Sequence, residues 1–321
     1  MLPPRLTASS SSTSVSGFLG RSVTALRPRP RVNPRRRREL AAAYLFLGPG
    51  FLLFALIILY PIVRAFQISL YRWSIVPGTA STFLGLHNYG RALHDPLFWR
   101  GLENAGFYMA VTVPAQIVLG MAVAVLLNAH MPARAFFRAV YYLPVVTSWV
   151  VVSLLFRYLF ITDGGFINGE LHLNIDWLGQ RWTAMLVLSI LGIWKGIGWS
   201  MVIFLGALQS VPRELHEAAA VDGAKALRRF RAVSLPAIRP VIAFVTILLV
   251  IGGFNVFISV YLITQGGPLD ETQVLLTYMY REAFSYLDFG YGSALAFVLT
   301  LIVFVLALVQ LRLFRRPSEA V

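Results

Sequence analysis

Six long apolar stretches constrain this 321-residue chain more than any other feature. Each is close to the roughly 20 residues that a helix needs to cross a lipid bilayer. Several contain Gly or Pro, which membrane helices tolerate because neighbouring groups satisfy the freed backbone. The sequence therefore predicts an all-α membrane protein with six transmembrane helices, at about residues 41–65, 105–129, 136–161, 184–209, 241–264 and 291–313.

Composition agrees with a lipid environment. Hydrophobic residues make up 57% of the chain and charged residues only 13%, whereas about a quarter of a typical soluble domain is charged. The chain has no Cys, which excludes a disulfide framework and a cysteine-based metal site. The net charge of +14 would favour a nucleic-acid partner in a soluble protein, so its location along the chain matters.

The location of the positive charge predicts the orientation of the chain. With the N-terminus inside the cell, the inner segments hold 20 of the 28 Lys and Arg residues, and the outer loops hold five of them and nine of the 14 acidic residues. Positive charge gathers in cytoplasmic loops, so we expect both termini in the cytoplasm and no nucleic-acid partner. The inner segments are the N-terminal tail, 134–138, 210–240 and the chain after 311, and the outer loops are 66–104, 162–183 and 265–290.

The N-terminal region differs from the rest of the chain. Residues 1–38 are rich in Ser, Pro and Arg and contain nine Arg and no acidic residue, a composition typical of a disordered tail. The Arg run before an apolar stretch also resembles a signal peptide, but the long span without a small-residue cleavage site favours an uncleaved first helix. We expect a basic cytoplasmic tail at 1–38, a transmembrane domain at 39–316 and a short C-terminal tail at 317–321.

The longest inner loop, residues 210–240, has a distinctive order of residues. Pro212 suits the start of a helix, and the negative charge of Glu217 suits the first turns of that helix. Gly223 is expected to end or bend it. A second short helix is expected over 224–230, stopped by the Leu-Pro step that follows. An ordinary basic loop at the membrane surface would explain the charge of this segment but not its order.

That order resembles the EAA loop of permease subunits in binding-protein-dependent ABC importers, in which an EAA triplet is followed by a Gly and then by Leu-Pro. The similarity covers about residues 41–313, and 83–108 and 263–284 resemble the carbohydrate branch of that family. The chain departs from the family in its longer tail and in Asn104-Ala105, where many members have Asn-Thr. The matching loop residues are Glu217, Ala218, Ala219, Asp222, Gly223, Leu235 and Pro236.

The resemblance implies a type I ABC importer permease fold in a bacterial-type cell membrane, with these seven residues coupling it to an ATPase. It also implies three kinds of partner besides the lipid bilayer: a second permease, generally a different chain in this branch, two ATPase subunits, and an extracytoplasmic solute-binding protein. The sequence has no phosphate-binding loop, so ATP and Mg are expected on the ATPase and no cofactor on this chain. The implied substrate is a sugar or related polyol, with sn-glycerol 3-phosphate as the alternative.

The sequence offers no candidate catalytic or metal site. No pair of carboxylates or nucleophile constellation lies at membrane depth, and the five His residues are scattered along the chain, so we expect a protein that is not itself an enzyme. The rival is a secondary transporter, which typically has internal repeats and ionisable relays at the midplane. We find neither clearly, and the 210–240 loop would have no use in such a protein.

Four residues are candidates for the substrate path. Lys195 is a Lys near the middle of a span, where charge usually faces the bundle interior or a watery cavity. It could meet a substrate oxygen, or pair with backbone carbonyls or a partner subunit. Asn255 could bind sugar hydroxyls, or join helices as membrane amides do. Trp199 and Tyr261 are weaker candidates of the same kind.

Overall fold

The computed structural model describes residues 34–76, 78–129 and 132–314, so most of both expected tails lies outside the described residues. The chain divides into two compact units, 1–59 and 60–321. In the first unit, α1 (Pro34–Phe54) continues into the π-helical turn η1 (Ala55–Leu59), and the side chains from residue 42 onward are almost all exposed. Because α1 begins at Pro34, the boundary expected at residue 38 falls within a helix.

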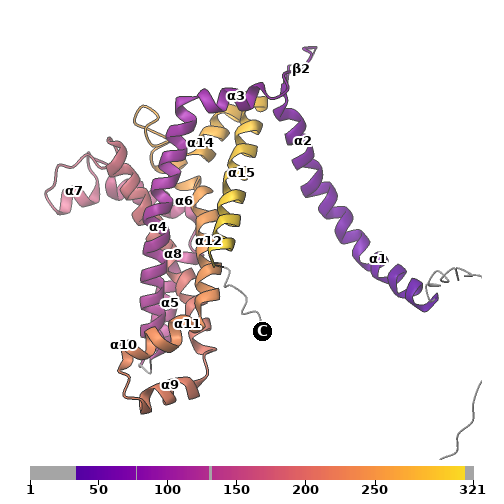
Figure 1. Cartoon of the computed structure of the whole chain (residues 1–321). Helices are drawn as coiled ribbons and strands as arrows, with labels where there is room; N and C mark the ends of the chain where they lie inside the picture. The colour runs from indigo at the N-terminus through magenta and orange to yellow at the C-terminus, as the bar shows by residue number, and fades with distance from the viewer. Residues whose placement is uncertain (1–33, 77, 130–131, 315–321) are drawn as a thin grey trace, which may run out of the picture. The chain divides into compact units, whose positions relative to one another are not determined.

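Long apolar helices dominate the second unit (Figure 1). Among the described residues, five helices are long and apolar enough to cross a membrane, or six if the bent pair α5 and α6 counts as one span. The two members of that pair meet at 91°, a bend that the expected single helix at 136–161 did not anticipate. The first span is Ala42–Ser69, which runs through α1, η1 and α2 (Tyr60–Ser69). The others are α4 (Pro96–Asn128), the bent pair α5 (Arg134–Val146) and α6 (Trp149–Phe160), α8 (Arg181–Gln209), α12 (Arg239–Phe254) together with α13 (Ile258–Ile263), and α15 (Phe289–Phe314).

The centre of this unit is the packing of α4 against α8. A Cβ atom added at Gly120 of α4 would lie 2.7 Å from Cβ of Ser200 on α8. A Cβ added at Gly192 of α8 would lie 2.1 Å from the hydroxyl of Tyr108 on α4. Small residues let membrane helices approach closely enough for van der Waals contact to hold them together. The glycines therefore set the distance between these two helices.

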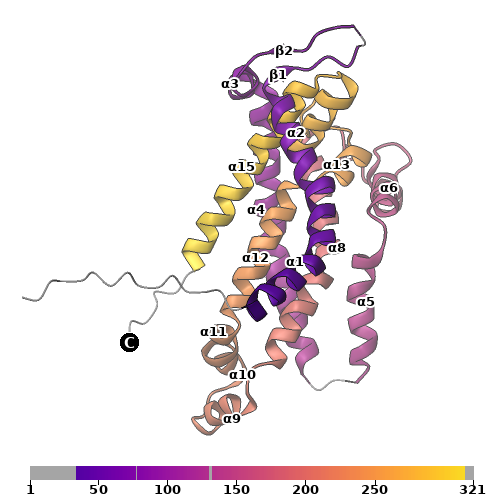
Figure 2. The same cartoon turned by 90° about the vertical axis from the view of Figure 1, so that its right-hand side faces the viewer.

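Shorter elements gather at the two ends of the second unit (Figure 2). We call these the α3 end and the α9 end. A short antiparallel ribbon of two strands, each of two residues, lies at the α3 end. The all-α prediction did not include it, because strands this short leave no alternating pattern in the sequence. The α3 end holds β1 (Tyr71–Arg72), β2 (Thr82–Phe83), α3 (His87–His94), α14 (Leu275–Tyr280) and η3 (Arg281–Ser285). The α9 end holds α9 (Arg213–Val221), α10 (Ala226–Arg229), η2 (Phe230–Ser234) and α11 (Leu235–Ala237). A further short helix, α7 (Phe166–Glu170), follows α6.

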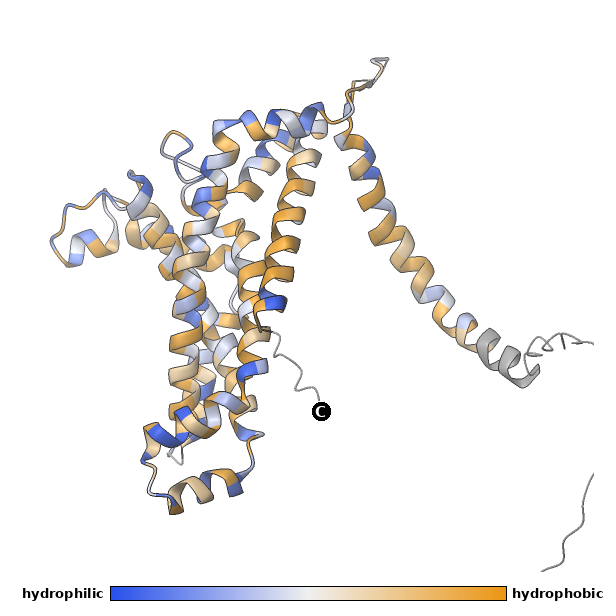
Figure 3. Ribbon diagram, in the orientation of Figure 1, coloured by the Kyte–Doolittle hydropathy of each residue, from blue (hydrophilic) through white to orange (hydrophobic). Residues whose placement is uncertain are grey.

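Hydropathy follows this arrangement. Apolar residues line the long helices, and hydrophilic residues concentrate toward the two ends (Figure 3). Helix α4 begins at Pro96, earlier than the apolar stretch, because Asp95 caps it by accepting a hydrogen bond from the Leu97 N–H at 2.9 Å. Such a cap satisfies one of the free N–H groups at a helix start. A polar first turn can thus extend an apolar helix beyond the span predicted from hydropathy.

One expectation for the 210–240 loop is wrong. The chain does not stop being helical at Leu235-Pro236 but continues through η2 and α11 to Ala237. In the π-helical turn η2, the Leu235 N–H donates to the carbonyl of Phe230. Pro236 lies in the first turn of the following α11, where a missing N–H is tolerated.

Candidate functional site

A cavity of about 710 Å³ is lined by residues of α4, α6, α8, α12, α13 and α14. Its lining combines aromatic and aliphatic side chains with a few uncharged polar groups, and none of the described residues that line it is Asp, Glu, Lys, Arg or His. Small-molecule sites are typically apolar with a few placed polar groups. The polar and aromatic residues of the lining are Tyr108, Thr112, Gln116, Trp149, Trp199, Asn255, Phe257 and Ser259.

One wall of the cavity is a stripe of polar residues on α4. Tyr108, Thr112 and Gln116 recur every four residues, so they share one face of the helix. Thr112 Oγ1 donates to the Tyr108 carbonyl at 2.7 Å, and Gln116 Nε2 donates to the Gly192 carbonyl of α8 at 3.3 Å. This stripe was not among the residues expected from the sequence to line the path, although its four-residue spacing within an apolar span is visible there.

Three of the four path candidates lie at or beside the cavity. Trp199 and Asn255 line it. Asn255 ends α12, and its Nδ2 donates to the Ile251 carbonyl at 2.8 Å, so part of the amide is used to finish the helix. Tyr261 is 43% exposed and stacks on the cavity residue Phe257, with ring centroids 5.3 Å apart and an interplanar angle of 11°.

Lys195 lies against the bend between α5 and α6. Its side chain is buried, and Nζ donates to the carbonyls of Pro144 at 2.7 Å and Thr147 at 2.6 Å. The same ammonium lies 4.9 Å from the ring centroid of Trp149, within range of a cation–π interaction. A helix end presents free carbonyls and partial negative charge, so Lys195 satisfies the end of α5. Lys195 itself is not one of the residues that line the cavity, whereas Trp149 is.

The 210–240 loop forms a compact turn at the α9 end. Asp222 caps the C-terminus of α9, and Gly223 follows with φ of +76°. The Gly223 N–H donates to the Ala220 carbonyl at 3.0 Å, and the Ala224 N–H donates to the Ala219 carbonyl at 2.9 Å. These two bonds form a Schellman motif. In this motif the residue after the C-cap adopts a left-handed backbone conformation, which Gly adopts without strain. The expected break at Gly223 is therefore present.

The turn leaves apolar side chains exposed. Leu215 is 50% exposed, Val221 is 89% exposed and Leu227 is 62% exposed. Glu217 and Ala218, from the EAA-like triplet, are exposed beside them. Phe230, by contrast, packs against the core cluster formed by α4, α8 and α12. The loop thus has one side anchored in the protein and another that is free.

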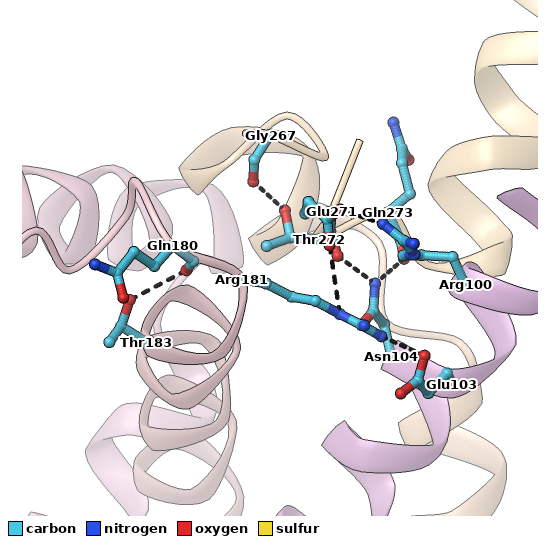
Figure 4. Close-up of polar contacts among 10 residues, drawn as sticks. All are labelled: Arg100, Glu103, Asn104, Gln180, Arg181, Thr183, Gly267, Glu271, Thr272 and Gln273. Carbon is cyan, nitrogen blue, oxygen red and sulfur yellow. Dashed lines mark hydrogen bonds and ion pairs between the residues drawn. The ribbon is translucent and has the colours of Figure 1, made fainter. Parts of the chain in front are cut away.

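A polar network ties three segments together at the α3 end (Figure 4). Asn104 is fully buried, and its Nδ2 donates to the carbonyls of Glu271 at 2.8 Å and Gln273 at 2.6 Å. Its Oδ1 accepts from Nε and Nη2 of Arg181, at 3.0 and 2.8 Å. Arg100 forms an ion pair with Glu271. Asn104 therefore joins α4, α8 and the loop before α14.

A second cluster of charged and aromatic groups lies nearby. Asp95 accepts hydrogen bonds from the hydroxyls of Tyr278 and Tyr291. Burial raises the pKa of Asp95, but these bonds and backbone N–H groups outweigh it, so the pKa lies below its usual range. Burial raises the pKa of Glu282, which the Arg91 guanidinium at 3.5 Å only partly opposes. The two carboxyls are thus shifted in opposite directions.

The chain is similar to proteins of known function. A family model described as "Binding-protein-dependent transport system inner membrane component" matches residues 116–318. The arabinooligosaccharides transport system permease protein AraP of Halalkalibacterium halodurans is 36% identical over 84% of this chain and 86% of its own length. The lactose transport system permease protein LacF of Rhizobium radiobacter is 34% identical over 83% of this chain and 92% of its own length.

A solved structure shares the fold. A chain of the bacterial alginate ABC transporter, crystallised in complex with an alginate pentasaccharide-bound periplasmic protein, matches with a TM-score of 0.78. The match covers 89% of this chain and 98% of that chain at 22% identity. The family model and both relatives span well over half of the sequence. The chain belongs to the binding-protein-dependent ABC importer permeases.

The resemblance inferred from the EAA-like loop is thus confirmed, as is the expectation of a multi-pass membrane permease. The permease has the type I ABC importer fold. Membership of this family excludes the secondary transporter considered from the sequence. Within the permease, the seven loop residues lie around the α9 end, whereas the path candidates lie at the cavity, beside it or against the α5–α6 bend.

Proposed function

We propose that this permease carries a neutral sugar, short oligosaccharide or related polyol through the membrane. The observation that supports this most is the uncharged cavity, where the α4 stripe and Asn255 offer hydroxyl and amide groups and Trp149, Trp199 and Phe257 offer rings. Hydroxyls need hydrogen-bonding partners, and the apolar face of a sugar ring packs on aromatic faces. Trp199, Asn255 and the stripe would contact the solute, while Lys195 would act indirectly through the bend and Trp149.

The same cavity argues against sn-glycerol 3-phosphate. A phosphate is usually bound by Arg, Lys or the N–H groups of a helix start, and the described lining contains no charged side chain. The names of AraP and LacF point to saccharides, and the similarity supports the same class here.

The α9 end would transmit ATP-driven motion. An ATPase subunit would dock on the exposed apolar side chains of the turn, with Glu217, Ala218, Ala219, Asp222 and Gly223 forming the docking helix and its end, and Leu235 and Pro236 joining it to α12. ATP and Mg would be bound by that ATPase, and the permease itself would be non-catalytic. Movement of the docked turn would shift α8 and α12, which flank both the turn and the cavity.

The remaining assembly follows from the charges and the family. Six spans, with α5 and α6 as one broken span, would put both termini on the same side of the membrane. The 20 of 28 basic residues in the inner segments support the cytoplasm as that side. The basic tail at 1–38 and the tail at 317–321 would then be cytoplasmic, flanking a permease domain at 39–316 in a bacterial-type cell membrane. A second permease, expected to be a different chain, and a second ATPase subunit would complete the importer. An extracytoplasmic binding protein would deliver solute at the α3 end.

ATPase activity of the reconstituted importer, with its partner permease, ATPase and binding protein, tests this proposal. We expect a neutral saccharide such as an arabino-oligosaccharide or lactose to stimulate hydrolysis, and glycerol 3-phosphate to have no effect. Stimulation by glycerol 3-phosphate alone would select the alternative substrate. An assembled complex without ATPase activity under any condition would overturn the importer function.

A further inference from the structure

Four aromatic rings follow one another from the cavity toward the α3 end. Phe257 stacks on Tyr261 at 5.3 Å, and Tyr280 lies 5.3 Å from Phe257 and 5.5 Å from Tyr261. Phe284 lies 5.0 Å from Tyr280. We call Phe257, Tyr261, Tyr280 and Phe284 the aromatic track. Its rings come from two segments, one around α13 and the other spanning α14 and η3.

The track begins inside the cavity. Phe257 and Leu276 are both cavity-lining residues, and Tyr261 and Tyr280 each follow one of them by four residues. Residues four apart lie on the same face of a helix, so the surface that lines the cavity continues along α13 and α14. A belt of lipid-facing aromatics would not begin at a cavity that also contains Thr112, Gln116 and Asn255.

The track leads outward along α14. A Cβ atom added at Gly101, in the second turn of α4, would lie 3.1 Å from the Leu275 backbone N. Tyr278 reaches Asp95, the residue that caps the very start of α4. Helix α14 therefore runs toward the N-terminal end of α4, and Tyr280 and Phe284 lie beyond Leu276 in that direction. Exposure agrees, because Tyr261 is 43% exposed and Phe284 is 60% exposed.

We propose that the aromatic track is an entry surface on which a saccharide slides from the α3 end into the cavity. The proposal rests on the proposed function, because it takes a sugar as the solute. Axial C–H groups of a sugar ring carry slight positive charge and pack on the negative face of an aromatic ring. Successive rings let the sugar move in small steps without losing all contact, and the hydroxyls of Tyr261 and Tyr280 offer hydrogen-bond partners along the way.

Cysteine labelling tests the track, first without solute and then with the saccharide that stimulates the ATPase. The chain has no Cys of its own, so Tyr261→Cys, Tyr280→Cys and Phe284→Cys each introduce a single thiol. The assembled importer in membrane vesicles is treated from the extracytoplasmic side with a membrane-impermeant cationic methanethiosulfonate, and the mass of this subunit reports the reaction. Tyr158→Cys is the matched control, since Tyr158 is 59% exposed on α6, which packs against α13.

We expect the three track thiols to react much faster than the thiol at position 158. The saccharide that stimulates the ATPase, presented on its binding protein, is expected to slow their labelling. Phe284→Leu, which keeps apolar bulk but removes the ring, is expected to raise the solute concentration needed for protecting position 261 by about two- to tenfold, the worth of one stacking contact.

Two results would overturn the track. Labelling no faster than at position 158 would mean that lipid or the second permease covers these rings. Fast labelling that no ATPase-stimulating saccharide slows would mean that the surface is wet but does not bind solute. In both cases stimulation of the ATPase by a saccharide would leave the proposed function standing, so the two failures are distinguishable.

Discussion

The ammonium of Lys195, on α8, lies 2.7 Å from the carbonyl oxygen of Pro144, which is close to the end of α5. The charge is buried in a membrane-spanning segment, yet it is satisfied by backbone carbonyls of the bend rather than by a carboxylate. We expect Lys195→Met to lower the melting temperature of the detergent-solubilised protein, because hydrogen bonds to charged groups are worth about 1.5–3 kcal/mol. Lys195→Arg should retain part of the stability.

Lys225 provides the control for that substitution. It is an exposed Lys near the Gly223 turn, so Lys225→Met removes the same charge without a buried partner and should leave melting nearly unchanged. Equal melting of the Lys195 and Lys225 variants would show that the carbonyl contacts do not stabilise the bend.

Asn104 should hold the loop before α14 in place. Asn104→Leu leaves two carbonyls and the Arg181 guanidinium without their buried partner, and each such loss costs about 1–3 kcal/mol. We expect faster hydrogen exchange in 265–273 and a lower melting temperature. Glu103→Gln is the matched control, because Glu103 also binds Arg181 at 2.6 Å but is 56% exposed, and such pairs contribute about 0–1 kcal/mol. Similar exchange in both variants would contradict the role of Asn104.

The close approach of α4 and α8 should not tolerate a larger side chain. Gly120→Ala places a Cβ 2.7 Å from Cβ of Ser200 and 3.2 Å from the backbone N of Met201 on α8, and overpacking of this kind destabilises by about 1–3 kcal/mol. Gly206→Ala, on α8 but with nothing within 4 Å, should be neutral or stabilising, since Ala favours helices. Thermal melting of the two variants checks the contrast, and an unchanged Gly120→Ala protein would argue against tight packing.

The Gly223 turn should be needed for coupling. Gly223→Pro forces φ to about −65°, whereas the turn requires +76°, and it removes the N–H that donates to Ala220. We expect the variant to reach the membrane but lose solute-stimulated ATPase activity and uptake. Gly164→Pro, at another glycine with positive φ and open surroundings, should retain both. Normal uptake by the Gly223 variant would contradict a role of this turn in coupling to the ATPase.

Glu282 should make stability depend on pH. Its raised pKa means that the folded state holds this proton more tightly than the unfolded chain. The free energy of unfolding should therefore fall as pH rises from the unfolded value near 4.5 through the folded value. Glu282→Gln removes this titration, so the variant should gain stability relative to the wild type as pH rises from 5 to 8. Parallel melting curves for the two proteins would contradict the burial of an ionisable group here.

Local signals in the sequence determined the long helices, the end of α9 and the family of this protein. The apolar stretches predict the long helices, because the length and hydropathy of a stretch are enough to suit it to lipid. Gly223 predicts the end of α9, because a left-handed position after a helix favours glycine whatever surrounds it. The order of residues in the 210–240 loop indicates the family, because that order can be recognised in the sequence before any tertiary contact is known.

Tertiary structure alone decided how the helices meet. The sequence does not place the 91° bend between α5 and α6, because the carbonyls it frees are satisfied by Lys195, which lies about fifty positions further along the chain. Nor does it pair Asn104 with Gln273, or the stripe at Tyr108 with Gly192. Hydropathy and helix caps act within a few residues, whereas a cavity and a polar network depend on which distant side chains packing brings together, and only the folded chain specifies that.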